Sequence, residues 1–280
     1  MNNPVISVIV PCYNQAIYLP EALQSVLEQE FQDWECIIVN DGSSDNTEEI
    51  AKEWEEKDKR FRYIYKPNSG VADARNQGIK EALGEYILPL DGDDKIGSRY
   101  IADALSIFHK NPTVKLVYSD VILFGSKNQE LKTAEYNYED MLTENHISVS
   151  GIFRKDDFIY VGGYNRNMIE GLEDWDFWLS FLRSDDAVIK LAGFHIYYRI
   201  KDVSRSTMID HTKNERLLLQ IFRNHVPLFL EYFNPIRDHI EADYYKREVK
   251  SYQNSIEYKI GRALLSPFRL LQSIYKRLFS

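Results

Sequence analysis

The stretch Ile87-Leu88-Pro89-Leu90-Asp91-Gly92-Asp93-Asp94-Lys95 decides the predicted fold of the chain. Its apolar run ends in three carboxylates within four residues, which predicts a buried strand that opens into a polar site at its C-terminal end. If the strand stays extended, Asp91 and Asp93 point to the same side. Such a pair suits a hard divalent cation that also binds substrate phosphates. The alternative is a surface turn, because Asp-Gly and Asp-Asp are common turn sequences.

The residues before this stretch alternate between strand-like and helix-like patterns. Strands are predicted at 5–10, 34–39 and 61–65, and helices at 19–31, over the segment that ends near 54, and at 71–83. A regular alternation of strands and helices is typical of βαβ units. We therefore predict an α/β fold with a mostly parallel, Rossmann-like central sheet that is flanked by helices on both faces.

Polar clusters follow the ends of the predicted strands. The first and second strands end at Pro11-Cys12-Tyr13-Asn14 and Asn40-Asp41-Gly42-Ser43, and the third leads into Asn68-Ser69-Gly70. In parallel α/β sheets the ligand crevice lies outside the C-terminal ends of the strands. The carboxylates at 91–94 would then share one edge with these clusters, which favours a metal site over a simple turn.

A second acidic cluster begins a predicted helix at Gly171-Leu172-Glu173-Asp174-Trp175-Asp176. Glu173 and Asp174 would either complement the helix dipole or present a rigid carboxylate that acts as a general base. Between the two acidic clusters the pattern predicts a helix at 99–109, strands at 114–124 and 148–153, and a long polar loop over the site at 125–145. Further strands are predicted at 187–192 and 194–200, and helices from 211 onward.

The composition fits a globular protein and argues against several other classes. The 280 residues are 44% hydrophobic and 28% charged, which is enough for a sizeable core. The net charge of −9 argues against nucleic acid as a partner. Cys12 and Cys36 lie in apolar runs and are predicted to be buried free thiols in a reducing, cytoplasmic compartment. No signal peptide and no transmembrane segment are predicted.

The C-terminal segment at 258–279 is basic and amphipathic. From 259 to 280 the chain carries five basic residues and no acidic one. A helix of this kind is typical of an element that lies on a membrane surface. The alternative is a helix that packs on the domain or on a partner subunit of an oligomer.

Five motifs, taken together, resemble the family 2 glycosyltransferases of the GT-A fold. They are Ser7-Val8-Ile9-Val10-Pro11-Cys12-Tyr13-Asn14, Val39-Asn40-Asp41-Gly42-Ser43-Ser44-Asp45, Gly70-Val71-Ala72-Asp73-Ala74-Arg75-Asn76, Leu90-Asp91-Gly92-Asp93-Asp94 and Glu173-Asp174-Trp175-Asp176. They follow the family's order and cover residues 5 to 206. The resemblance implies an inverting transferase that uses a nucleotide diphosphate sugar together with Mg²⁺ or Mn²⁺.

The resemblance also implies roles for individual residues at the nucleotide. Those that would contact it are Pro11, Tyr13, Asn14, Asp41, Ser43, Asn68, Arg75, Asp91 and Gly92. Asp41 would accept hydrogen bonds from the base, and Arg75 would lie beside the nucleotide or its diphosphate. The alternative for Arg75 is a salt bridge to a carboxylate such as Asp41 or Asp91, and the two roles are compatible.

The metal ligands and the catalytic base are implied in the same way. Asp91 and Asp93 would form an Asp-x-Asp motif that contacts the ribose and the metal, and Asp94 would share that work. Asp174 would take the proton from the acceptor hydroxyl, with Glu173 as a supporting residue.

One position departs from the family's pattern. Many members carry a histidine after a Tyr-Arg pair, and that histidine can help to hold the metal or the diphosphate. Here Tyr198-Arg199-Ile200 is followed by Lys201. A charged lysine does not ligate a cation, but it pairs with a phosphate. We therefore expect Lys201 at the diphosphate, and a cation that depends on the phosphates of the donor.

The resemblance sets the expected organisation of the chain. The catalytic domain would span 1–206, with a nucleotide-binding half near 1–95 and an acceptor half near 96–206, and a helical extension would follow at 207–280. The donor would be a nucleotide sugar, with uridine as the base by family habit. The acceptor would be a hydroxyl of a glycan or a lipid-linked molecule in cell-surface polysaccharide synthesis. A lipid-linked acceptor would fit the first of the two alternatives for the basic tail, attachment at the inner face of the plasma membrane.

Two other functions share parts of this pattern. A catalytically silent nucleotide-sugar-binding module is disfavoured because the carboxylates at 91, 93, 173 and 174 are all present. A nucleotidyltransferase would share the α/β architecture and the carboxylate–metal chemistry. It would, however, carry a glycine-rich basic loop where this chain has Pro11-Cys12-Tyr13-Asn14-Gln15. Release of nucleoside diphosphate rather than pyrophosphate separates the two enzymes.

Overall fold

The computed structural model describes residues 3–201, 210–233 and 235–260. It divides the chain into two compact units, Met1–Val226 and Pro227–Ser280. The second unit contains α10 (Pro235–Asn254) and most of α9 (Val226–Tyr232). Most of the amphipathic tail predicted at 258–279 lies outside the described residues, as does the domain boundary predicted at 206.

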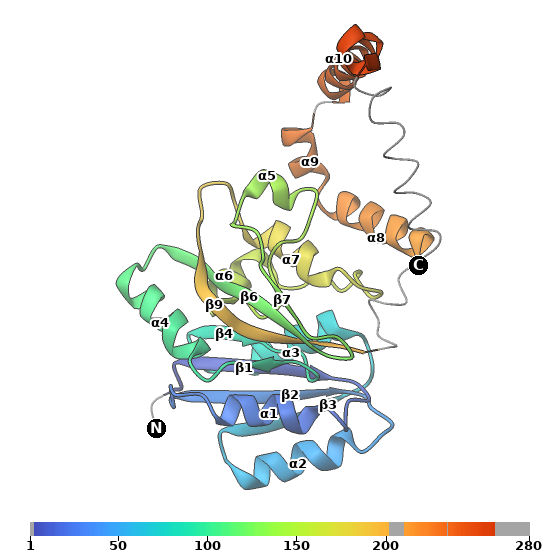
Figure 1. Cartoon of the computed structure of the whole chain (residues 1–280). Coiled ribbons are helices and arrows are strands. Elements are labelled where there is room, and N and C mark those ends of the chain that lie inside the picture. The colour runs from blue at the N-terminus through green and yellow to red at the C-terminus, as the bar shows by residue number, and fades with distance from the viewer. Residues whose placement is uncertain (1–2, 202–209, 234, 261–280) are drawn as a thin grey trace. The chain divides into compact units, whose positions relative to one another are not determined.

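The first third of the chain has the predicted alternation of strands and helices. Its elements are β1 (Ile6–Cys12), α1 (Leu19–Leu27), β2 (Trp34–Asp41), α2 (Thr47–Lys57), β3 (Phe61–Lys66), α3 (Val71–Glu81) and β4 (Tyr86–Pro89) (Figure 1). Every residue of β1 and of β2 is buried, as expected for strands that are covered on both faces. The predicted α/β class is confirmed.

The order of the strands places the ends of β1 and β4 at the centre of the sheet. The order is β3-β2-β1-β4-β8-β6-β9-β5, and β7 pairs with β6 at the side. β3, β2, β1 and β4 are parallel, with Ser7 opposite both Glu35 and Ile87. The chain therefore adds strands first on one side of β1 and then on the other. Such a reversal leaves a crevice outside the C-terminal ends of β1 and β4.

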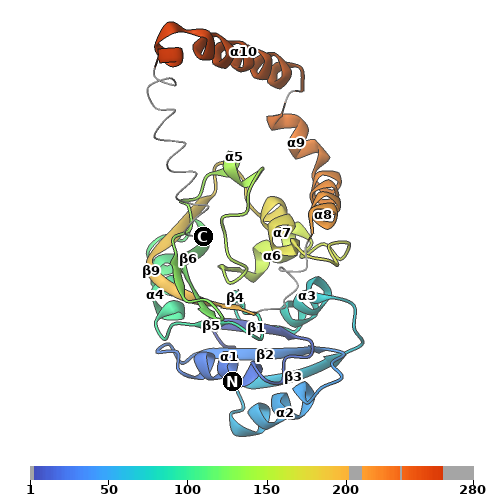
Figure 2. The ribbon, with the colours of Figure 1, turned by 45° about the vertical axis from the view of Figure 1, so that its right-hand side comes forward.

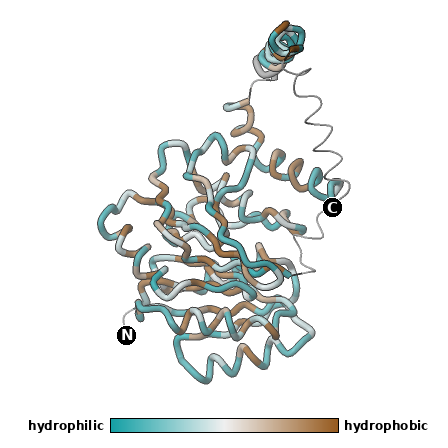
Figure 3. The backbone as a smooth tube through the Cα atoms, viewed as in Figure 1, coloured by the Kyte–Doolittle hydropathy of each residue, from teal (hydrophilic) through white to brown (hydrophobic). Residues whose placement is uncertain are grey.

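Successive residues of the strands pack against helices on opposite faces. Val8 and Val10 belong to the same apolar cluster as residues of α1 and α2. Ile9 and Val39 face α3 instead, because a Cβ at Gly78 of α3 would lie only 2.9 Å from a methyl group of Val39 and closer still to Ile9. A glycine is thus required where α3 meets the sheet. Figure 3 shows hydrophobic residues concentrated along the strands.

The remainder of the first unit extends the sheet and adds helices to it. Its elements are β5 (Lys95–Ile96), α4 (Tyr100–Lys110), β6 (Val114–Gly125), β7 (Gln129–Leu131), α5 (Tyr138–Met141), β8 (Ile152–Arg154), α6 (Lys155–Val161), α7 (Glu173–Phe181), β9 (Ala187–Ile200) and α8 (His211–Asn224). β8 runs antiparallel to β4 and to β6, whereas β6 and β9 are parallel. Figure 2 shows β6 and β9 curving together away from the layer of β1, β2 and β3.

Two details differ from the sequence-based expectation. The segment predicted as a loop at 125–145 contains β7 and α5. The two strands predicted at 187–192 and 194–200 are one strand, β9, which pairs with β6 throughout. Gly193 has a φ of +95°, and the register shifts next to it, from Leu191 opposite Ser119 to Phe194 opposite Asp120. The glycine therefore marks a β-bulge rather than a turn between strands.

Two further expectations concern the cysteines and the membrane. Cys12 and Cys36 are buried and free, as predicted from their apolar surroundings. Burial is also the main reason that the pKa of each thiol is raised. Within the described part of the chain, none of the helices combines the length and the apolar character needed to cross a membrane.

Candidate functional site

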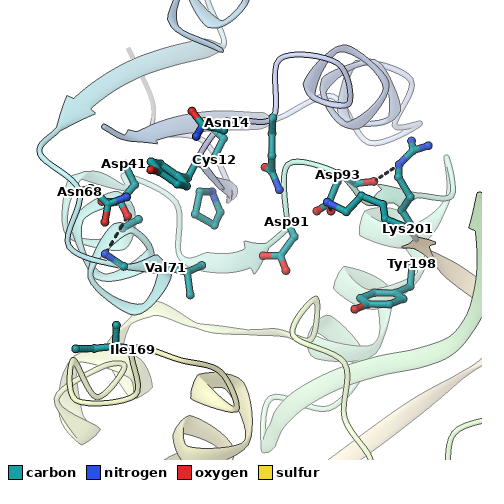
Figure 4. A pocket seen from close by; sticks show the side chains of 16 residues that line it. Cys12, Asn14, Asp41, Asn68, Val71, Asp91, Asp93, Ile169, Tyr198 and Lys201 are labelled. Carbon is teal, nitrogen blue, oxygen red and sulfur yellow. Dashed lines mark hydrogen bonds and ion pairs between the residues drawn. The ribbon is translucent and has the colours of Figure 1, made fainter. Parts of the chain in front are cut away.

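Two adjoining cavities open at the C-terminal edge of the sheet. The first has a volume of about 460 Å³, and its walls include Pro11, Tyr13, Asn14, Gln15, Asp41, Asn68, Asp93, Arg199 and Lys201 (Figure 4). The second has a volume of about 380 Å³, and its walls include Arg75, Asn145, His146, Glu173 and Asp174, with an apolar side formed by Val121, Leu123, Leu131, Ile147, Val149 and Leu172. Both cavities are lined by Asp91 and Tyr198, so two bound molecules could meet at this point.

The three carboxylates that follow β4 are not equivalent. Asp91 and Asp93 line the first cavity, and the turn between them is closed by a 2.9 Å hydrogen bond from the Asp94 N–H to the Asp91 carbonyl. The side chain of Asp94 instead points inward, where it accepts a 2.8 Å hydrogen bond from the backbone N–H of Arg199. Burial, followed by the charges of Asp93 and Asp91, raises the pKa of Asp94 well above its usual range.

Gly92 has a packing role in the same turn. A Cβ at this position would lie 3.3 Å from the Cβ of Cys12 and closer still to the side-chain amide of Gln15. The turn after β4 therefore approaches the loop after β1 so closely that a side chain would displace one of them. This close packing accounts for the glycine between the two aspartates. No contact between Gly92 and a ligand is needed to explain it.

Arg75 links the two acidic clusters. Its guanidinium is buried and lies 2.6 Å from Oδ1 of Asp91 through Nη2 and 2.9 Å from Oε1 of Glu173 through Nη1. The ring of Tyr164 lies 5.4 Å from the guanidinium carbon. The salt bridge to Asp91 was one of the two roles predicted for Arg75, whereas the partnership with Glu173 was not predicted. α3 thereby fixes the end of β4 relative to the start of α7.

Asp174 stands at the start of α7 in the wall of the second cavity. Its Oδ2 accepts a 2.9 Å hydrogen bond from Nδ2 of Asn145. Burial raises the pKa of Asp174 to about 6, and the charge of Glu173 adds to this effect while that of Arg75 opposes it. A carboxyl group with such a pKa is a good acceptor for a proton near neutral pH.

Two cationic side chains from the end of β9 lie beside the carboxylate turn. Nζ of Lys201 is 2.5 Å from Oδ2 of Asp93. The guanidinium of Arg199 lies between the rings of Tyr18 and Phe124, at 4.8 and 4.3 Å, and its Nε donates a 2.9 Å hydrogen bond to the carbonyl of Asp93. Arg199 also lies 3.1 Å from the carboxylate of Glu21, so both cations have carboxylate partners, and a phosphate group that took the place of one of these carboxylates would be stabilised next to Asp93.

The opposite side of the first cavity is formed by the ends of β1 and β2. Figure 4 shows Asp41 and Asn68 on this side, Asp93 and Lys201 on the other, and Asp91 between them. The carboxylate of Asp41 accepts hydrogen bonds from the N–H groups of Ser69 and Gly70, at 3.0 and 2.9 Å, and lies 2.5 Å from Nζ of Lys66. Asp41 thus holds the loop after β3 in place.

Ser43, like Gly92, was predicted at the nucleotide but is not among the described residues that line the two cavities. Its Oγ accepts a 3.0 Å hydrogen bond from the N–H of Asn14, a residue with a φ of +51°. The side chain of Asn14 in turn accepts a 2.8 Å hydrogen bond from the N–H of Ser44. These contacts join the loops after β1 and β2.

Known proteins resemble the part of the chain that forms this site. A sequence model described as Glycosyl transferase family 2 matches residues 7–158. The chain belongs to this family. The protein "Uncharacterized glycosyltransferase EpsJ" of Bacillus subtilis is 45% identical over 95 residues, which are 34% of this chain and 28% of EpsJ. The protein "Putative teichuronic acid biosynthesis glycosyltransferase TuaG", also of Bacillus subtilis, is 44% identical over 93 residues, which are 33% of this chain and 37% of TuaG.

Solved structures of glycosyltransferases share the fold of this family 2 chain. The crystal structure of S. aureus TarS 1-349 in complex with UDP-GlcNAc matches it with a TM-score of 0.67 and 20% identity, over 92% of this chain and 78% of that chain. This likeness confirms the predicted GT-A fold. The chain spans less than half the length of many of the curated relatives that it matches, from 18% to 49% for six of them.

The carboxylates of this family 2 glycosyltransferase fit a cation that takes only part of its coordination from the protein. Among the described residues, no three His, Cys, Asp or Glu side chains come together as a complete metal site. Asp91 and Asp93 both line the first cavity, and their ion pairs with Arg75 and Lys201 use one oxygen of each. Mg²⁺ commonly binds through one or two carboxylates and completes its shell with phosphate oxygens and water.

The sequence interpretation missed several residues of the site, among them Asn145, Arg199 and Gln15. Asn145 lies in a polar segment with no periodicity, Arg199 was noted only as a neighbour of Lys201, and Gln15 follows a motif without belonging to it. The Tyr198-Arg199 pair was the one available signal, because it precedes the position where the family often has a histidine. The partners of Asn145 and Gln15 are distant in sequence, so local pattern carries no trace of them.

Proposed function

We propose that the chain transfers a sugar from a nucleotide diphosphate sugar in the first cavity to an acceptor hydroxyl in the second. One observation carries the proposal: the two cavities meet at Asp91, with cationic side chains in the wall of one and a carboxyl of raised pKa in the wall of the other. A leaving group that gains negative charge and a hydroxyl that loses a proton need these two environments on opposite sides of one sugar.

The first cavity would hold the nucleotide at the ends of β1 and β2 and the diphosphate near Asp93. Asp91 and Asp93 would hold Mg²⁺ or Mn²⁺, which when bound neutralises charge on the diphosphate. Lys201 lies 2.5 Å from Asp93 and would exchange this partner for a phosphate oxygen when the donor binds. Arg199 keeps the turn in shape through its bond to the Asp93 carbonyl.

Asp174 would act as the general base in the second cavity. As the acceptor oxygen attacks the anomeric carbon, the bond from that carbon to the phosphate oxygen breaks, and the hydroxyl proton passes to a carboxylate oxygen of Asp174. The sugar is transferred with inversion, and the nucleoside diphosphate leaves. Arg75 contacts both Asp91 and Glu173, so it would maintain the distance between the donor and the base during this step.

The proposed identity of the donor and the acceptor rests on the names of related proteins and on the sequence motifs. TuaG is named for teichuronic acid biosynthesis, which supports an acceptor in cell-surface polysaccharide synthesis, either a glycan or a lipid-linked molecule. We propose uridine as the donor base, and a position at the cytoplasmic side of the membrane. The direct test is a thermal-shift panel of UDP-, GDP- and TDP-sugars with Mn²⁺, in which a UDP-sugar should raise the unfolding temperature most. A panel without any stabilising nucleotide sugar would refute the donor assignment.

The pH dependence of the reaction should reveal the pKa of the general base. Because Asp174 must be ionised to accept a proton and its pKa is about 6, kcat/KM should be constant near neutrality. Below pH 6 it should fall about tenfold per pH unit as the carboxylate is protonated. Initial rates of nucleoside diphosphate release from pH 4.5 to 8.5 would check this. A kcat/KM that stays level down to pH 4.5 would contradict the assignment.

Loss of a carboxylate that holds the cation should weaken binding of the sugar donor and should leave the general base unaffected. Asp93→Asn should weaken Mn²⁺-dependent binding of the nucleoside diphosphate about tenfold or more, because a charged ligand is lost. Binding of Mn²⁺ without nucleotide should be weak in both proteins, since among the described residues the cation is proposed to depend on two carboxylates, Asp91 and Asp93. Calorimetric titration measures both affinities. Asp103→Asn on α4 is the control, and equal losses in the two variants would rule out a special role for Asp93.

A further inference from the structure

Asn145 lies near the end of a segment that packs between the sheet and the helix of the proposed base. The segment, residues 126–147, follows β6, forms β7 and α5, and ends beside α7. Asn145 is the residue of this segment whose side chain reaches Asp174, at 2.9 Å from its Nδ2 to Oδ2 of the carboxylate. The family resemblance assigns it no role, so the contact calls for an explanation of its own.

The sheet holds the first part of the segment firmly. Thr133 donates its N–H and its hydroxyl to Oδ1 of Asp120 on β6, at 2.9 and 3.1 Å. Nζ of Lys190 on β9 donates a 2.9 Å hydrogen bond to the carbonyl of Thr133 and lies 3.3 Å from Asp120. The hydroxyl of Tyr118 bonds to the carbonyl of Ala134 at 2.8 Å. These contacts fix the segment before it turns toward α7.

The helix that carries Asp174 holds the last part of the segment. The indole N–H of Trp175 donates a 2.7 Å hydrogen bond to the carbonyl of Met141, and that of Trp178 donates a 3.2 Å hydrogen bond to the carbonyl of Ile147. Both indoles are buried. The backbone on each side of Asn145 is therefore tied to α7, and the distance between Asn145 and Asp174 is set by contacts within one local unit.

The orientation of the Asn145 amide is determined by its own backbone. Its Oδ1 accepts a 3.2 Å hydrogen bond from the N–H of Ile147. Because an amide has one acceptor oxygen and one donor nitrogen, the NH₂ group must then face Asp174. The hydrogen bond from Ile147 therefore keeps the amide of Asn145 from rotating, and the NH₂ group stays directed at the Asp174 carboxylate.

We propose that Asn145 is a positioning residue for the base, which orients the Asp174 carboxylate toward the acceptor hydroxyl and favours its ionised form. The inference rests on the proposed role of Asp174. A donor to a carboxylate stabilises the charged state more than the neutral one. The other ionisable groups that face this carboxylate or share its cavity are Glu173, Arg75, Asp91, Tyr164 and His146. The backbone N–H of Trp175 also donates to the Asp174 carboxylate, and Asn145 adds a neutral side-chain donor.

Two variants separate orientation from folding. Asn145→Asp keeps an acceptor for the Ile147 N–H but replaces the donor with a charge, and Asn145→Leu removes both functions at a similar volume. In each variant, the pH below which kcat/KM begins to fall should rise by about one unit or more. Turnover at pH 6 should fall about fivefold or more, while nucleoside diphosphate affinity stays within twofold. The probe is Mn²⁺ with the nucleotide sugar that stabilises the protein most, assayed as nucleoside diphosphate released.

Asn137→Asp is the matched control. Asn137 lies in the same segment and caps α5 by accepting hydrogen bonds from the N–H groups of Glu139 and Asp140, which an aspartate also accepts. It adds the same charge without touching Asp174, so its profile should equal that of the wild type. An unmoved pH profile in both Asn145 variants, or an equal shift in Asn137→Asp, would overturn the inference. If Asp174→Asn itself retained normal turnover, the proposed function would fail instead.

Discussion

Asp174→Asn is expected to lower turnover by about 10²–10⁴-fold and to leave nucleoside diphosphate binding intact. The substitution keeps the shape of the side chain, and its amide oxygen can still accept the hydrogen bond from Asn145. It removes the group that takes the proton. Asp174 lines the second cavity and not the first, so the contacts proposed for the donor are unchanged.

Turnover and binding must be measured on the same preparation. Single-turnover release of nucleoside diphosphate gives the rate, and calorimetric titration with nucleoside diphosphate and Mn²⁺ gives the affinity. Asp156→Asn, an exposed carboxylate in the first turn of α6, is the matched control and should behave as the wild type. Near-normal turnover in Asp174→Asn would show that another group accepts the proton.

Arg75→Leu should lower the free energy of unfolding by about 3–5 kcal/mol. The guanidinium is buried between Asp91 and Glu173, and its removal takes away a positive charge that both carboxylates contact. Glu173 is itself buried, so losing this contact raises the free-energy cost of keeping its charge in the interior. Urea unfolding followed by circular dichroism measures the change.

A second variant identifies the cause of that loss. If the uncompensated charge is responsible, the double variant Arg75→Leu with Glu173→Gln should recover part of the lost stability. Arg99→Leu removes an arginine whose ion pair with Asp103 is exposed, and it should leave the free energy of unfolding unchanged. An Arg75→Leu protein as stable as the wild type would contradict the bridging role.

The first ninety residues could be predicted well because their local patterns are unambiguous. β-branched runs such as Val5 to Val10 form strands that are buried on both faces, and helical spacing such as that of Leu19, Leu23 and Val26 gives α1 its buried side. Strand ends in a parallel sheet share one edge. This rule was enough to predict that Asp41, Asp91 and Asp93 lie around one cavity.

The parts that could not be predicted depend on contacts between distant residues. The three carboxylates after β4 look alike in sequence, and only the backbone N–H of Arg199, 105 positions away, distinguishes Asp94 from the other two. Arg75 and Glu173 are 98 positions apart, and Asn145 and Asp174 are 29 apart. Local propensity contains no information about such pairs, because they form only when the sheet brings α3, α7 and the 126–147 segment together.

The proposed transfer is tested by identifying the products formed from the preferred nucleotide sugar. With Mn²⁺ and either water or an acceptor glycan, we expect release of the nucleoside diphosphate and a sugar product with inverted anomeric configuration, both monitored by ³¹P and ¹H NMR. Pyrophosphate should be absent, and Asp174→Asn should abolish the signal. Release of pyrophosphate, or a product with retained configuration, would refute the proposed inverting transfer.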